Sequence, residues 1–121
     1  MPTAKTDVIR LRHMLDASRK AILFTKAKSR RDLDVDEQLS LALVRLLEIV
    51  GEAATTVTPE GQNRYSTIPW KTVIGTRNRL IHGYYQVNLD VLWQIVSTDL
   101  PALVIELQKA IDNEEQQQKL F

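Results

Sequence analysis

The sequence contains no cysteine, only two histidines, and four residues each of glycine and proline. The absence of cysteine excludes a disulfide scaffold, a thiolate zinc site, an iron–sulfur cluster and a cysteine nucleophile. Two histidines argue against a self-contained catalytic zinc site, so we expect neither a metal nor a cofactor. No apolar run is long enough to span a membrane, and residues 1–20 carry seven charged side chains, which is unlike a signal peptide. We therefore expect a soluble, cytoplasmic domain.

Charge alternates along the 121 residues, although the net charge is only +1. Residues 1–31 hold nine Lys/Arg and two Asp, and residues 61–89 hold four Lys/Arg and no acid. The segments 32–60 and 90–121 have net charges of −6 and −4. Two basic segments brought side by side would form a positive face for a polyanion. Helix faces that pair with each other within the chain explain the same pattern, and charge alone leaves both open.

Apolar residues recur with helical spacing throughout the chain. The first stripe predicts a helix over residues 5–26, followed by a charged loop over residues 27–33. A second helix is expected to start near Asp34, because Asp34 and Glu37 have the spacing of a capping box. Its broad apolar face indicates burial on two sides, which predicts that it is the central helix.

The second half of the chain is predicted to hold two further long helices. Thr58–Thr67 is expected to be a connector with one helical turn. Pro69 suits the first position of a third helix, and Gly83 suits its left-handed terminator. Asn88 or Asp90 is expected to cap the last helix.

Pro101 lies inside the apolar stripe of the last predicted helix. It should kink that helix or restart it with Asp99 as the cap. The whole pattern predicts an all-α bundle of four to five helices, with a single domain over residues 1–113 and a polar tail over residues 114–121.

The segment Arg77–Tyr84 concentrates cations, an amide, an imidazole and a phenol. On a regular helix Asn78 and His82 lie about 40° apart and share a face, whereas Arg77 and His82 lie about 140° apart. Cleavage of an RNA phosphodiester needs a base for the 2′-hydroxyl and a cation for the charge that develops on phosphorus. Histidine and arginine supply these two functions near neutral pH. A lone histidine near a helix end can equally be a capping or packing residue.

Arg77, His82 and Tyr84 match the pattern Arg-x4-His-x-Tyr, and Asn78 places a polar residue directly after the arginine. In this motif the sequence resembles the HepT-type toxins, a branch of the HEPN superfamily. The resemblance extends, in order, over about residues 48–101. The segments that carry it are Glu48–Ala54, Ile68–Trp70, Arg77–Tyr84, Val91–Trp93 and Asp99–Pro101.

The resemblance implies a dimeric helical bundle in which two motifs meet in a cleft. It further implies a metal-independent endoribonuclease toxin, with Arg77, Asn78 and His82 as catalytic residues and Arg79 as a phosphate-binding residue on RNA. The implied partner is a nucleotidyltransferase antitoxin of the MntA type, which neutralises the toxin by transferring AMP to Tyr84. The alternative is a non-catalytic HEPN module that binds RNA, nucleotide or a nucleotidyltransferase partner.

Three further side chains have two possible roles. Trp70 and Trp93 lie on apolar helical stripes, which favours the core, although either could stack on RNA bases. Glu52 interrupts an apolar run and is expected to be solvated or to pair with an arginine of the site.

Overall fold

The computed structural model describes residues 4–83 and 86–120, and in these ranges the chain is almost entirely helical. The elements in chain order are α1 (Lys5–Phe24), α2 (Asp32–Val35), α3 (Glu37–Thr56), α4 (Pro59–Arg64), α5 (Trp70–Ile74), α6 (Thr76–Leu80), β1 (Ile81–His82), β2 (Gln86–Val87), α7 (Leu89–Gln94), the π-helical segment η1 (Ile95–Asp99) and α8 (Leu100–Leu120). The prediction of an all-α HEPN-like bundle is confirmed.

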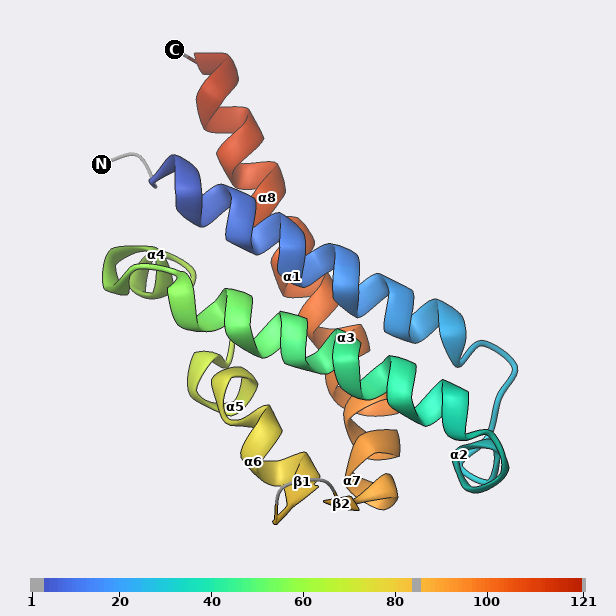
Figure 1. The fold of residues 1–121 in the computed structure, drawn as a ribbon. Helices are drawn as coiled ribbons and strands as arrows, with labels where there is room; N and C mark the ends of the chain where they lie inside the picture. Colours follow the sequence, from blue (N-terminus) through green and yellow to red (C-terminus); the bar gives the residue numbers. More distant parts are fainter. Residues whose placement is uncertain (1–3, 84–85, 121) are drawn as a thin grey trace.

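The three long helices form the body of the molecule. Figure 1 shows α1 and α3 running side by side in opposite directions, with α8 crossing behind them. The short helices α5 and α6 pack along the other side of α3, so α3 is the central helix as predicted. The largest fully buried apolar side chains come from α1, α3, α6, α7, η1, α8 and the connector before α5: Leu11, Met14, Leu43, Leu47, Ile68, Leu80, Leu92, Val96 and Leu107.

The first helix agrees with its prediction to within two residues at its end. Its buried stripe includes Val8, Leu11, Leu15 and Ser18. Beyond the helix, Ala27 has a φ of 62°, a left-handed conformation that turns the chain out of the helix toward α2.

The start of the central helix was predicted at the wrong residue. Asp36, not Asp34, is the N-cap, and its carboxylate accepts a hydrogen bond of 3.0 Å from the Leu39 amide. Asp34 instead belongs to the four-residue helix α2, where its carboxylate pairs with Arg30 at 3.0 Å. Only Asp34 has an acid, Glu37, at capping-box spacing, whereas the residue three positions after Asp36 is Leu39, so the spacing rule favoured the wrong aspartate.

The connector between α3 and α5 holds the helical turn that the sequence predicts. Thr58 caps α4 by accepting a hydrogen bond of 3.1 Å from the Gly61 amide. The buried carboxylate of Asp7, on α1, accepts hydrogen bonds from the Thr58 amide at 3.0 Å and from its hydroxyl at 2.5 Å. A Cβ on Gly61 would lie 2.5 Å from Asp7 Oδ2, so only glycine fits against this joint. Asp7 therefore fastens α4 to α1.

A second polar joint fastens the end of α4 to α8. Glu114 is only 5% exposed. Its carboxylate accepts a hydrogen bond from the Tyr65 hydroxyl and forms an ion pair of 3.3 Å with Arg64. The Asn113 amide donates to the Tyr65 hydroxyl at 2.9 Å. The polar residues predicted as a tail thus continue α8 to Leu120, and one of them is buried in this joint.

The last helical stretch is interrupted just before Pro101. Asn88 caps α7 by accepting from the Val91 amide at 3.1 Å, which confirms one of the two predicted caps. At η1 the Leu100 amide donates to the Ile95 carbonyl, five residues back. This wider turn accommodates the proline, which has no amide to donate and clashes with an α-helical carbonyl. Asp99 does not cap a new helix, because helical backbone continues through Leu100.

No helix within residues 4–83 and 86–120 is long and apolar enough to cross a membrane.

Candidate active site

The motif segment lies on α6 and on the two-stranded hairpin that follows it. This region is at the end of the molecule away from both chain termini (Figure 1). Ile81 pairs with Val87 and His82 with Gln86, in antiparallel register. Gly83 has a φ of 68°, so the predicted left-handed glycine is confirmed, but it turns a hairpin and does not terminate a helix.

The prediction of one helix from Pro69 to Gly83 is wrong in two places. Helix α5 stops at Gly75, and α6 stops at Leu80, because Ile81 has extended backbone angles (φ −102°, ψ 121°). The Asn88 amide donates to the Leu80 carbonyl at 2.8 Å, which satisfies a carbonyl that the ended helix leaves free. This bond ties the start of α7 to the end of α6.

Because the helix ends at Leu80, His82 lies on a strand and not in the last turn of a helix. The predicted helical face shared by Asn78 and His82 therefore does not exist. No hydrogen bond joins Arg77, Asn78 and His82 within the described chain, and all three side chains are exposed.

Two buried residues bracket the exposed part of α6. Leu80 is 1% exposed, and Thr76 is buried and donates its hydroxyl to the Thr72 carbonyl at 3.2 Å. The residues between these anchors, 77–79, point to solvent. The local packing thus presents two guanidinium groups and one amide on the surface.

The two arginines of α6 differ in their partners. Arg79 forms an ion pair of 3.4 Å with Asp99 on η1, and both side chains are more than a third exposed. Arg77 forms no ion pair with any described residue. An exposed pair of this kind contributes about 0–1 kcal/mol, so an incoming phosphate can compete for Arg79. Arg77 is already available to an anion.

An apolar groove of about 540 Å³ runs beside the motif helix, between α5–α6 and η1–α8. Leu47 and Val50 of α3 form its floor, and Arg79 and Asp99 lie on its rim. Sequence reasoning did not find this groove, because it depends on how η1 is placed against α6.

Glu52 is exposed on α3 and forms no ion pair within the described residues. It lines a small hollow with Arg10 and His13, on the side of α3 that faces α1. Of its two predicted roles, the structure supports the solvated carboxylate. Trp70 is buried, with its indole N–H donating to the Gln62 and Tyr65 carbonyls at 3.1 Å, which confirms it as a core residue.

Two further expectations concern the AMP acceptor Tyr84 and a bound metal ion. Tyr84, the predicted AMP acceptor, lies outside the described residues. Among the residues that are described, no group of three or more His, Asp or Glu side chains could hold a metal ion.

The hairpin and the Arg79–Asp99 pair are two further features that sequence reasoning missed. The hairpin has a weak signal: β-branched Ile81 and Val87 flank a glycine at hairpin distance. The sequence indicated Asp99 only as a possible helix cap and not as a partner of Arg79, which lies twenty residues away on another element.

The family model for ribonuclease HepT-like proteins matches residues 14–110. The chain belongs to the HepT-like ribonuclease family. Of the curated proteins, "Putative RNase TTE0752" of Caldanaerobacter subterraneus subsp. tengcongensis is 34% identical over 104 residues, which cover 86% of this chain and 93% of that protein. "Putative RNase MJ1380" of Methanocaldococcus jannaschii is 32% identical over 95 residues, covering 78% of this chain and 87% of that protein.

A third HepT-like relative, "Probable ribonuclease HepT" of Thermococcus cleftensis, is 34% identical over 86 residues. The aligned part covers 71% of this chain and 78% of that protein. No solved structure matches the chain. The resemblance to HepT-type toxins that the motif indicates is confirmed.

Proposed function

We propose that this HepT-like chain is the toxin of a toxin–antitoxin pair and cleaves RNA as a metal-independent endoribonuclease. Membership of a ribonuclease family and the RNase names of the relatives support the reaction class. The observation that carries the proposal is that Arg77 and His82 are both exposed and unpaired within the described chain, on adjacent elements.

His82 is assigned the proton transfer. Its imidazole removes the proton from a 2′-hydroxyl, whose oxygen then attacks the adjacent phosphorus while the bond to the 5′-oxygen breaks, and the leaving 5′-oxygen takes a proton from water. Arg77 binds two oxygens of the pentacoordinate phosphorus through its guanidinium fork. Asn78 does not hydrogen-bond His82, so its amide is assigned to a phosphate oxygen. Arg79 binds a neighbouring phosphate in exchange for Asp99.

A homodimer would complete this site. Within the described residues no hydrogen bond or ion pair joins Arg77, Asn78 and His82, so no such bond orients the base toward the guanidinium. The apolar groove beside α6 is a surface that a second copy would cover, bringing the two motif segments together. Light scattering at micromolar concentration should give the dimer mass, and a monomer mass would contradict the composite site.

The proposed regulation is transfer of AMP to Tyr84 by an MntA-like nucleotidyltransferase antitoxin. Tyr84 follows His82 by two residues, so an added phosphate would lie within the same segment as Arg77 and Arg79. Its negative charge and bulk would compete with RNA. After incubation with such a partner and ATP, intact mass should show added AMP in the wild type and none in Tyr84→Phe. AMP that persists in Tyr84→Phe would move the modification to another residue.

The reaction itself is tested by incubating the purified protein with RNA in the presence of a chelator. Fragments should form with the wild type and not with His82→Ala. Loss of cleavage on adding chelator would contradict a metal-free mechanism. RNA that is bound but never cleaved would instead support the non-catalytic HEPN module.

A further inference from the structure

A second groove, of about 590 Å³, lies on another part of the molecule, between the carboxyl end of α1 and the stretch α7–η1–α8. Trp93, Val96 and Pro101 line one side of it, and Arg19, Lys26 and Lys28 lie on the other. None of the described residues that line it carries a carboxylate. It shares no residue with the apolar groove beside α6.

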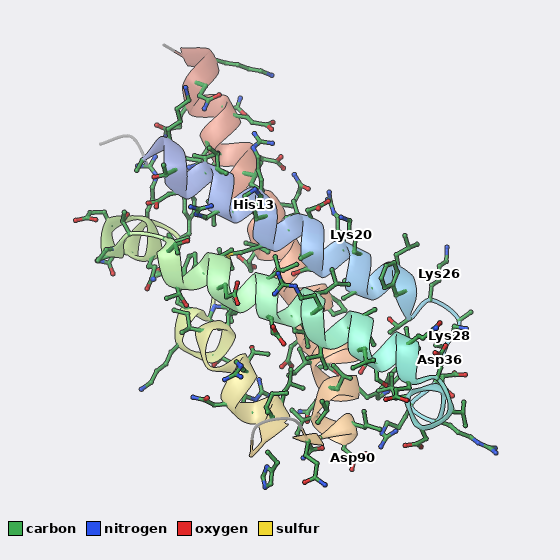
Figure 2. All side chains as sticks on the ribbon, viewed as in Figure 1. His13, Lys20, Lys26, Lys28, Asp36 and Asp90 are labelled. Carbon is green, nitrogen blue, oxygen red and sulfur yellow. The ribbon has the colours of Figure 1, made fainter. Side chains whose placement is uncertain are left out.

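The cations of this groove are available to a ligand. Lys26 and Lys28 are exposed and form no ion pair within residues 4–83 and 86–120. Figure 2 shows both at the same end of the molecule, where α1 leads into the loop before α2. Arg19 is engaged only by a neutral group, the side-chain oxygen of Gln108.

The acid at the start of α2, Asp32, already accepts hydrogen bonds from Ser29. The pKa of Asp32 is lowered mainly by a hydrogen bond from the Ser29 backbone, and the charges of Lys28 and Arg31 contribute less. Asp32 accepts hydrogen bonds from the Ser29 amide and hydroxyl, and within the described residues it forms no ion pair with Lys26 or Lys28. The positive charges of Lys26 and Lys28 therefore face solvent.

The aromatic ring in this groove differs from the other tryptophan of the chain. Trp70 is buried and its indole N–H is bonded. Trp93 is only partly buried, and its indole forms no hydrogen bond to any described residue. Cations beside an aromatic surface are the combination that binds single-stranded nucleic acid, with phosphates on the cations and a base stacked on the ring.

We infer that the α1–η1 groove is a second RNA-contacting site, in which one base stacks on Trp93 and adjacent phosphates bind Lys26 and Lys28. This rests on the proposed function in one respect, the choice of RNA as the polyanion. An acidic amphipathic helix is the competing occupant of a basic, apolar groove. The Trp93 ring favours RNA as the occupant, because an acidic amphipathic helix would need only aliphatic side chains in the groove and no aromatic ring.

Helix α7 links the groove to the motif segment. The Asn88 amide at its start is bonded to the carbonyl of Leu80, the last residue of α6, and Trp93 follows Asn88 by five residues along α7.

The test measures binding and not cleavage, so its failure is distinct from failure of the proposed function. The probe is a labelled single-stranded oligonucleotide with 2′-O-methyl sugars, which lack the attacking hydroxyl. The variants are Lys26→Glu/Lys28→Glu and, as a control with the same charge change, Lys5→Glu/Lys119→Glu at the far ends of α1 and α8. All four lysines are exposed, so the fold is retained.

The groove variant should bind the probe at least about tenfold more weakly at low salt, and its log–log salt slope should fall by about 1.4, for two lost phosphate contacts. The control should bind like the wild type. The probe should quench tryptophan emission in the wild type and not in Trp93→Phe, where the buried Trp70 is the only emitter.

Equal affinities and slopes for the groove variant and its control would overturn the proposal. So would quenching that persists in Trp93→Phe. If the groove variant bound RNA normally but lost a labelled Leu/Glu amphipathic peptide, the groove would be a protein-docking surface and the RNA site would be wrong.

Discussion

The two ends of the molecule use polar side chains in opposite ways. Where α4 meets α1 and α8, polar groups are buried and fully engaged, as in the joints of Asp7 with Thr58 and of Tyr65 with Glu114. At α6 and the hairpin, Arg77, Asn78 and His82 are exposed, and no hydrogen bond or ion pair within the described residues joins them.

This contrast separates residues that hold the fold from residues offered to a ligand. A buried carboxylate persists only when donors surround it, so removing it leaves those donors unsatisfied. Truncating an exposed arginine or histidine side chain lowers the stability of the protein only slightly, because water already solvates the guanidinium or imidazole in the folded state. Variants at the two ends should therefore affect different measurements.

The largest effect on stability is expected from Asp7→Ala. This change removes the acceptor of both the Thr58 amide and the Thr58 hydroxyl, in a buried place. The free energy of unfolding should fall by about 2–4 kcal/mol in urea titrations. Asp16→Ala is the matched control, since Asp16 lies on the same helix with a 70% exposed side chain and one ion pair to Lys20. Equal losses for the two variants would contradict the role of the joint.

A smaller effect is expected from Gly83→Ala in the hairpin. A Cβ at this position meets nothing within 4 Å, so the cost is only that of the left-handed backbone. The unfolding free energy should fall by about 1–2 kcal/mol. Gly83→Asn should cost less, because asparagine tolerates this conformation. A larger loss than that of Asp7→Ala would show that the hairpin end holds the fold together.

The smallest effect concerns the pH dependence contributed by Asp32. Hydrogen bonds from Ser29 lower the pKa of Asp32 below its ordinary value of 3.8, so its stabilisation is present above that pH and is lost as the pH falls through the lowered value. Asp32→Asn should lower the melting temperature slightly at pH 7, and the difference should close in acid. A difference in melting temperature that persists at low pH would show that the effect of Asp32→Asn does not come from the ionised Asp32 carboxylate.

Periodicity predicts the long helices well, because each buries one continuous stripe. The stripe of Val8, Leu11 and Leu15 placed α1 correctly, and the broad face of α3 identified it as central. The start of α3 was predicted less well, because Glu37 lies three residues after Asp34 and indicated a capping box there. In the structure Asp34 instead pairs with Arg30, and Asp36 caps the helix.

The sequence predicted which residues form the candidate site but not the backbone conformation that positions them. The residue types at Arg77, Asn78 and His82 indicated the chemistry, yet the helical geometry assigned to them was wrong. Ile81 leaves the helix because it pairs with Val87, a tertiary contact that no helical periodicity reports. The π turn before Pro101 and the Arg79–Asp99 pair were hidden for the same reason.

The central claim is that RNA cleavage depends on Arg77 and His82, whereas the stability of the fold does not depend on them. Cleavage rate and urea midpoint should be measured on the same preparations of wild type, Arg77→Lys and His82→Ala. The account predicts that His82→Ala loses cleavage by about a hundredfold or more, that Arg77→Lys is also severely impaired, and that both midpoints stay at the wild-type value. Wild-type cleavage by His82→Ala, with the midpoint unchanged, would contradict it.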